Sequence, residues 1–193
     1  GIVNRAGNIV WRLGPDYSIS ESTKELGQII GQHNPHIIPK GLPGEGNILV
    51  FDNGGSAGYG FADPAAPDGR DSVRRDFSRV LEFDPITLEI IWEYSIGGSE
   101  KFQFFSHYVS NAQRLPNGNT MVTEGSDGRI FELTEDKQIV WEYMSPFHGT
   151  EEPISRRIFR AYRLPYEWVP QLDRPQQMQV VPPDNGTFRV PSQ

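Results

Sequence analysis

The chain has 193 residues, a formal net charge of −7 and no cysteine. An acidic chain without a basic block is a poor candidate for binding nucleic acid, and the lack of cysteine excludes disulfides, thiolate metal sites and a cysteine nucleophile. No apolar run approaches the ~18 residues that a membrane helix needs, and the first residues show no signal-peptide pattern. The 20 glycines and 16 prolines, with 11% aromatic residues, favour a folded, turn-rich, all-β domain.

The first part of the chain predicts a strand, a helix and a long loop. Residues 8–13 have the pattern of the last strand of a repeating unit. Residues 21–30 carry apolar side chains at helical spacing, with Ser20 or Ser22 available as the N-cap, and predict a short helix. Residues 54–76 are rich in glycine, alanine, proline and aspartate and lack a periodic apolar pattern, so we expect an inserted loop there.

Two longer segments repeat one strand pattern. Each contains a Gly-Asn pair that opens a strand, at 46–47 and 118–119, and a Trp-Glu-Tyr sequence in its last strand, at 92–94 and 141–143. A histidine-bearing strand precedes the Gly-Asn pair, and a strand that begins with arginine follows it. A repeat of about 40–50 residues made of four short strands is typical of a β-propeller blade. The sequence therefore predicts an all-β propeller of four-stranded antiparallel blades.

The repeat sets approximate bounds for the blades. Complete blades are expected at 32–95 and 106–144, with partial blades at 1–15 and 157–193, so that 1–193 forms a single partial propeller domain. Propellers typically close with four to eight blades, and an open one would expose long sheet edges. We therefore expect further blades, supplied by the same gene product or by a neighbouring chain.

A set of short motifs carries a family resemblance. Gln-His at 32–33, Val-Phe-Asp-Asn-Gly at 50–54, Ser-Arg at 78–79 and Trp-Glu-Tyr at 92–94 occur in this order. As a set they resemble the arylsulfotransferase (aryl-sulfate sulfotransferase) family, and the resemblance extends over roughly residues 8–170. It implies a six-bladed β-propeller that is exported to the periplasm or the cell exterior.

The resemblance also implies a reaction. Bacterial members of this family move a sulfuryl group from a phenolic sulfate ester to a phenol through a sulfated histidine, without a nucleotide donor or another cofactor. The histidine of the Gln-His motif falls on His33, the predicted catalytic residue. A neutral imidazole must present one nitrogen as the nucleophile, so we expect a carboxylate or carbonyl to accept a hydrogen bond from the other nitrogen. The polar end of the strand at 50–54 can orient the ring.

Candidate substrate ligands come mainly from the predicted first strands. In a propeller the first strand of each blade lines the central channel, and alternate residues point into it. Sulfate oxygens require cationic or hydrogen-bonding groups there. The predicted substrate-binding residues are Asn34, Asn53, His107, Asn111, Arg160 and Arg163. Strand parity allows only one of His33 and His36 to face the channel, and the two arginines are also candidates for salt bridges between blades. The histidine spacings do not fit zinc, so no metal is expected.

Two other classes of function remain open. Residues 84–92 resemble the blade motif of quinone-dependent dehydrogenases, but Leu88 replaces its glycine, and that motif packs blades without binding the quinone. A non-catalytic binding or scaffold module that uses the loop face of the propeller is the second alternative. Channel histidines and an arginine in the other blades would distinguish the enzyme from both.

Overall fold

The chain divides between Arg163 and Leu164 into two units. The computed structural model describes residues 1–62, 71–147, 149 and 155–174. In the second unit the described residues contain a short 3-10 helix, η2 (Tyr166–Trp168). The strands of the described residues all lie in the first unit.

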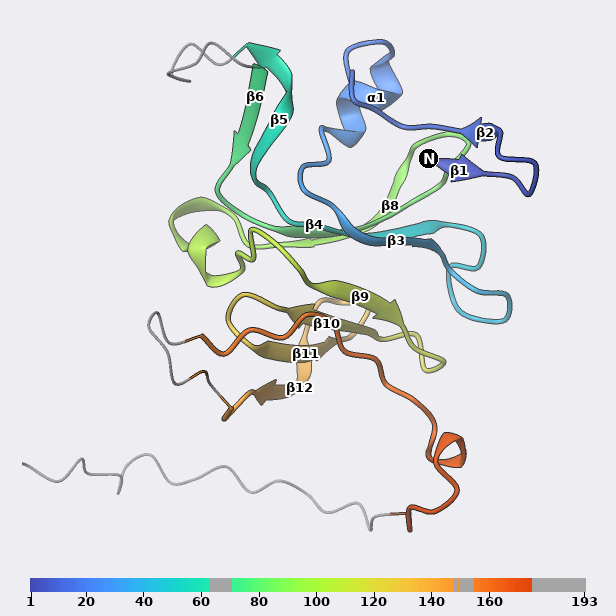
Figure 1. Ribbon diagram of the computed structural model, residues 1–193, viewed down its shortest axis with the longest axis vertical. Helices are drawn as coiled ribbons and strands as arrows, with labels where there is room; N and C mark the ends of the chain where they lie inside the picture. Colours follow the sequence, from blue (N-terminus) through green and yellow to red (C-terminus); the bar gives the residue numbers. More distant parts are fainter. Residues whose placement is uncertain (63–70, 148, 150–154, 175–193) are drawn as a thin grey trace, which may run out of the picture. The chain divides into compact units, whose positions relative to one another are not determined.

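Eight strands of the first unit form two antiparallel four-stranded sheets (Figure 1). Blade 1 has the order β3-β4-β7-β8, with the strands β3 (His33–Ile37), β4 (Ile48–Asp52), β7 (Arg79–Phe83) and β8 (Ile90–Ser95). Blade 2 has the order β12-β11-β10-β9, with the strands β9 (Asn111–Arg114), β10 (Thr120–Glu124), β11 (Arg129–Leu133) and β12 (Ile139–Met144). The prediction of an all-β fold made of four-stranded antiparallel blades is confirmed.

The inner strands of blade 1 are buried on both faces. Successive side chains of a strand point to opposite faces, and in β4 four consecutive residues are apolar. In β4, Leu49 and Phe51 enter a core shared with blade 2, while Ile48 and Val50 enter a second core on the opposite face. The shared core contains Ile38, Leu49, Phe51, Val80, Trp92, Tyr94, Phe104, Ala112, Val122, Phe131 and Leu133. The second core contains Leu26, Ile29, Ile48, Val50, Leu81 and Phe83. Burial of this apolar surface, at about 25 cal/mol per Å², is the main force that stacks the blades.

The helix is shorter than predicted. α1 spans Glu21–Leu26, whereas the periodicity predicted a helix over 21–30. Ser20 is the N-cap and forms a capping box with Thr23, in agreement with one of the two predicted caps. Gly27 ends the helix because its backbone takes φ 71°, in the left-handed region that favours glycine.

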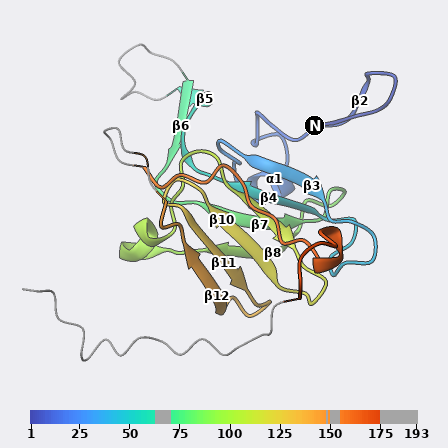
Figure 2. The same ribbon diagram turned by 60° about the horizontal axis from the view of Figure 1, so that its bottom comes forward.

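The stretch predicted as a loop at 54–76 contains a β-hairpin, so that prediction was wrong. β5 (Gly55–Ala62) pairs antiparallel with β6 (Asp71–Arg75), and the hairpin projects from the end of β4 (Figure 2). The prediction relied on apolar periodicity, and a two-stranded ladder is held by backbone hydrogen bonds that require none. The part of the predicted loop at 63–70 lies outside the described residues.

Other short elements flank the two blades. The strand predicted at 8–13 is present as β2 (Ile9–Trp11) and pairs with β1 (Ile2–Val3). A 3-10 helix that was not predicted, η1 (Gly98–Gln103), lies between β8 and β9 along the chain. In the described part of the chain, none of the helices has the length and apolar character that a bilayer crossing requires.

The first strand of blade 2 begins later than predicted. β9 starts at Asn111 and not at His107. Val109 and Ser110 take φ 54° and 85°, which turn the chain out of the extended conformation just before the strand. Residues 105–110 therefore form a connector between η1 and β9, and His107 lies in this connector.

Residues 157–164 were predicted to start a further blade. They run alongside β9 but do not form a regular strand. The Asn111 side chain donates from Nδ2 to the Ala161 carbonyl (2.9 Å) and accepts at Oδ1 from the Ala161 N–H (3.1 Å). The Gln113 side chain forms the same pair of bonds with the Arg163 backbone, at 3.1 and 2.8 Å. Amide side chains thus replace part of the backbone ladder along this edge of β9.

A recurring contact joins neighbouring sheets. Trp11 Nε1 in β2 donates to the Pro85 carbonyl in the turn before β8 (2.8 Å), and Trp92 Nε1 in β8 donates to the Glu135 carbonyl in the turn before β12 (2.9 Å). Arg114 of blade 2 lies over the Trp92 ring, 5.8 Å from its centroid, and forms an ion pair with a glutamate of β7. The tryptophan of the repeat therefore packs and hydrogen-bonds between sheets.

Candidate functional site

His33, the predicted catalytic residue, stands at the start of β3 and is half-buried. Its Nδ1 lies 2.9 Å from the Gly31 carbonyl oxygen and 2.7 Å from Asn53 Oδ1. Gly31 can present its carbonyl in this way because its backbone takes φ 63°, which turns the chain into β3. A carbonyl oxygen only accepts, so Nδ1 carries the proton and the neutral ring has its lone pair on Nε2. Within the described residues, Nε2 has no hydrogen-bond partner.

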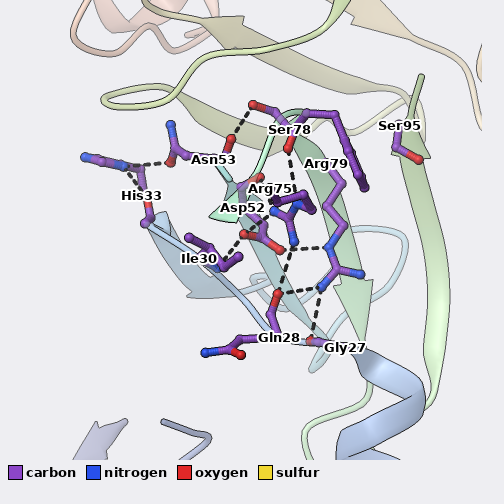
Figure 3. A network of polar contacts seen from close by, with 12 residues as sticks. Gly27, Gln28, Ile30, His33, Asp52, Asn53, Arg75, Ser78, Arg79 and Ser95 are labelled. Carbon is purple, nitrogen blue, oxygen red and sulfur yellow. Dashed lines mark hydrogen bonds and ion pairs between the residues drawn. The ribbon is translucent and has the colours of Figure 1, made fainter. Parts of the chain in front are cut away.

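Asn53 follows β4 directly and is fully buried. Its Oδ1 faces His33 (Figure 3). Its Nδ2 donates to the carbonyl oxygens of Ser106 (2.6 Å) and Val109 (2.9 Å) in the connector. The Ser78 hydroxyl donates to the Asn53 carbonyl at 2.7 Å. The polar atoms of Asn53 are therefore occupied by protein groups, and one of those groups is the predicted catalytic ring.

Asp52, the last residue of β4, is buried between two arginines (Figure 3). Its Oδ1 lies 2.6 Å from Arg75 Nη2 and accepts from the Ile30 N–H at 2.7 Å. Its Oδ2 accepts from Arg79 Nε at 2.7 Å. The carboxylate and its two partners remain hydrogen-bonded inside the protein, as buried charges require.

The same two guanidinium groups hold the segment that leads from α1 into β3. Arg79 donates to the carbonyl oxygens of Leu26, Gly27 and Gln28, at 3.1, 3.1 and 3.3 Å. Arg75, the last residue of the hairpin, also donates to the Gln28 carbonyl (3.0 Å). The position of the Gly31 carbonyl against His33 therefore depends on this network.

His107 is exposed and lies in the connector. Its ring centroid is 4.4 Å from that of Tyr108 and 6.1 Å from that of Phe105. A Cβ added to Gly55, at the base of the hairpin, would meet His107 Cβ at 3.2 Å. The structure thus brings the connector that carries His107 to the end of β4, beside Asn53.

Asn34 and Arg160 are linked through a tyrosine. The Tyr162 hydroxyl donates to Asn34 Oδ1 and accepts from Arg160 Nη1, both at 3.2 Å. Asn34 Nδ2 also donates to the Ala112 carbonyl in β9 (3.3 Å). Arg160 and Tyr162 are exposed, whereas Asn34 is half-buried. Tyr162 was not predicted as a site residue, because a single tyrosine forms no motif.

Asn111 and Arg163 serve other contacts. Asn111 is buried, and its amide bonds the backbone of residues 157–164 as described above. Arg163 forms an ion pair with Glu132 of β11. The alternative prediction for this residue was a salt bridge between blades, and here the arginine comes from a segment without a regular strand. Burial opposes ionisation of Glu132, but hydrogen bonds from Asn119, Asn117 and Arg163 outweigh it and lower the pKa of the carboxyl.

His36, on the same strand as His33, contacts the backbone of Asn34. Its Nδ1 is 2.9 Å from the Asn34 carbonyl oxygen, and its side chain lines a largely apolar cavity of about 290 Å³ between β2 and the face of blade 1. His33 is not among the residues that line this cavity. Across the described residues, His, Asp and Glu side chains form no group of three or more that could hold a metal ion.

The groups that sequence reasoning missed are mostly backbone atoms. The carbonyls of Gly31, Ser106 and Val109 hold the His33–Asn53 pair, and a backbone carbonyl leaves no mark on the amino-acid sequence. Gly31, two residues before His33, was the one sequence signal of this arrangement, since a tight turn just before a strand favours glycine.

Comparison with known proteins identifies the family. A sequence model of the arylsulfotransferases (ASST) matches residues 2–146, a stretch that contains His33, Asn53 and both blades. No curated protein and no solved structure shows a significant match. The match covers more than half of the chain and agrees with the motifs at 32–33 and 50–54. The chain therefore belongs to the arylsulfotransferase family.

Proposed function

We propose that the protein transfers a sulfuryl group from a phenolic sulfate ester to a phenol, with His33 as the nucleophile. The observation that carries the proposal is the pair of acceptors at His33 Nδ1, the Gly31 carbonyl and Asn53 Oδ1. Together they keep the proton on Nδ1 and leave the electron pair of Nε2 for attack on sulfur. Membership of the arylsulfotransferase family supports this substrate class. The proposed reaction uses no metal and no cofactor.

The reaction takes two steps. First, His33 Nε2 attacks the sulfur atom, a nitrogen–sulfur bond forms, and the bond between sulfur and the phenolic oxygen breaks. The phenolate leaves and takes a proton from water. Second, the oxygen of the acceptor phenol attacks the same sulfur, the nitrogen–sulfur bond breaks, and the acceptor releases its proton to water. The Gly31 carbonyl stabilises the positive ring of the sulfated intermediate, because Nδ1 remains its donor.

The remaining predicted ligands divide into two groups. We propose Asn34, His107 and Arg160 as substrate ligands, since they are half-buried or exposed and a sulfate oxygen can compete for their polar atoms. Asn111 and Arg163 are instead proposed to hold residues 157–164 against blade 2, because their polar groups bond there.

The proposal also includes further blades, because one face of blade 2 is exposed. The outer face of blade 2 exposes Trp141, whose counterpart Trp92 is covered by the next sheet. We propose that further blades, from the same gene product or a neighbouring chain, cover this face and complete a propeller. By analogy with the family, we propose that the protein works in the periplasm or outside the cell.

Sulfuryl transfer is tested directly with a chromogenic aryl sulfate and a phenol acceptor. The wild-type protein should release the chromophore in a phenol-dependent manner, and His33→Ala and His33→Asn should abolish the release. The melting temperature should stay within a few degrees, because a half-buried polar group contributes only about 1 kcal/mol. His36→Asn is the matched control, and it should retain transfer.

Transfer by His33→Ala at the wild-type rate would overturn the proposal. A folded wild-type protein that turns over no aryl sulfate would favour the non-catalytic binding or scaffold module.

A further inference from the structure

The amide of Asn53 can adopt only one orientation in this structure. Its nitrogen and oxygen are alike in shape, so the hydrogen-bond partners decide which is which. The carbonyl oxygens of Ser106 and Val109, at 2.6 and 2.9 Å, can only accept, so the NH₂ group must face them. Oδ1 must then face His33 Nδ1 at 2.7 Å, and it can only accept a hydrogen bond from an N–H at that nitrogen.

The two orienting carbonyls belong to the connector between the blades. Val109 takes φ 54° there, a left-handed conformation that is unusual for a β-branched residue. Ser110, at φ 85°, anchors this turn: its hydroxyl donates to Ser106 Oγ (2.8 Å) and accepts from the Gly125 N–H of blade 2 (2.9 Å). Unfavourable backbone conformations persist where the surrounding contacts enforce them, and they are concentrated at functional sites.

Blade 2 has no histidine at the position that corresponds to His33 and no asparagine at the position that corresponds to Asn53. The strand registers place Asn111 at the position of His33. Each pairs with the second-last residue of the second strand of its blade, Asn111 with Thr123 in β10 and His33 with Phe51 in β4. The residue that follows β10, in the position of Asn53, is Gly125. A glycine has no side chain to orient a ring, so the arrangement belongs to blade 1.

We infer that Asn53 is a positioning residue that holds His33 in the Nδ1–H tautomer, and that the Val109 backbone orients Asn53 for this purpose. The tautomer of a side chain in blade 1 is thus set by the connector that leads into blade 2. The inference deepens the proposed function, on which its consequence for turnover rests. The tautomer itself is measurable without any turnover.

The test is ¹⁵N NMR of the full chain with labelled histidine at a pH where the rings are neutral. His33→Asn identifies the His33 signals by their loss. The wild-type ring should be the Nδ1–H tautomer. Asn53→Ala should give a mixture of both tautomers, because the Gly31 carbonyl, the more distant of the two acceptors, then acts alone. In the same variant, aryl sulfate turnover should fall about tenfold or more. Loss of a group that orients a metal-ligating histidine has an effect of this size, about 10–100-fold.

Two further variants separate positioning from general damage. Asn119→Ala removes an asparagine amide that bonds Glu132 in blade 2, and it should leave the His33 signals unchanged. Val109→Gly keeps the carbonyl and suits φ 54°, so the Nδ1–H tautomer should persist, whereas Val109→Pro cannot adopt this φ and should lose it.

The inference is overturned if the wild-type ring is the Nε2–H tautomer, or if Asn53→Ala keeps the Nδ1–H tautomer. If Asn53→Ala does not fold, the wild-type spectrum and the Val109 pair decide. A wild-type protein with the expected tautomer and no sulfuryl transfer would refute the proposed function and leave this inference standing.

Discussion

Blade 1 and blade 2 carry the same Trp-Glu-Tyr pattern in their last strands and differ in what lies against it. In blade 1, Trp92 is 9% exposed and Tyr94 is 7% exposed, because blade 2 packs over them. In blade 2, Trp141 is 42% exposed. The same local sequence therefore yields a core strand or an exposed strand according to its neighbour, so the burial of this motif is a property of the joint between sheets.

The two blades also differ at the end of the second strand. Asp52 in blade 1 is bonded by two arginines, and one of these, Arg75, comes from the inserted hairpin. Glu124 in blade 2 has one arginine, Arg129, which it shares with Glu142. The histidine site lies in the blade with the additional guanidinium. The hairpin is thus an insertion in the blade that carries the proposed catalytic histidine.

The largest expected effect is the loss of the blade 1 carboxylate. Asp52→Asn leaves Arg75 and Arg79 without their buried counter-charge, so we expect the free energy of unfolding to fall by about 4 kcal/mol. Glu124→Gln, the matched change in blade 2, should cost much less, since Arg129 keeps a second acid. Denaturant unfolding of both variants measures the difference, and equal losses would contradict it.

A smaller effect is expected at the joint between the blades. Arg114→Met leaves the buried Glu82 unpaired and should cost about 3 kcal/mol. Arg163→Met removes the corresponding pair with Glu132, but that arginine side chain is 42% exposed, so about 1 kcal/mol is expected. A larger loss of stability for Arg163→Met than for Arg114→Met in thermal unfolding would contradict this ranking of the two ion pairs.

The tryptophans should show the same ranking at lower magnitude. Trp92→Phe loses the hydrogen bond to the Glu135 carbonyl and some packing, and should cost about 2 kcal/mol. Trp141→Phe changes a partly exposed ring and should cost less than about 0.5 kcal/mol. These values are measured on the chain in isolation. A large loss for Trp141→Phe would show that its face is covered in solution.

The smallest effect concerns pH. Burial raises the pKa of Glu124, although the charge of Arg129 and the hydrogen bond from the Phe105 N–H act in the opposite direction. The folded state then binds its proton more tightly than the unfolded state does, so this group stabilises the fold below pH 4.5 and that contribution is lost as the pH rises through the raised pKa. The stability of wild type relative to Glu124→Gln should therefore fall as the pH rises above 4.5, and a rise would contradict the assignment.

The repeat was enough to predict the blades, because four strand-length apolar segments recur with the same turn and tryptophan positions. The end of α1 at Gly27 and the hairpin at β5–β6 were not predicted, since one depends on a single backbone angle and the other on a backbone ladder. Motifs were enough to name His33 and Asn53 as candidate site residues. Their relation was not, because it depends on the carbonyls of Ser106 and Val109, which lie far along the chain.

The central claim is that His33 Nε2 becomes sulfated, and trapping the intermediate tests it most directly. The protein is incubated with an aryl sulfate without acceptor, quenched at alkaline pH, digested with trypsin and analysed by mass spectrometry. The peptide of residues 25–40 contains both His33 and His36, so fragment ions must locate the group. We predict one sulfuryl group on His33, which disappears when phenol is added and is absent in His33→Asn. A sulfuryl group on His36 or His107, or phenol-dependent transfer with no sulfated histidine, would contradict the account.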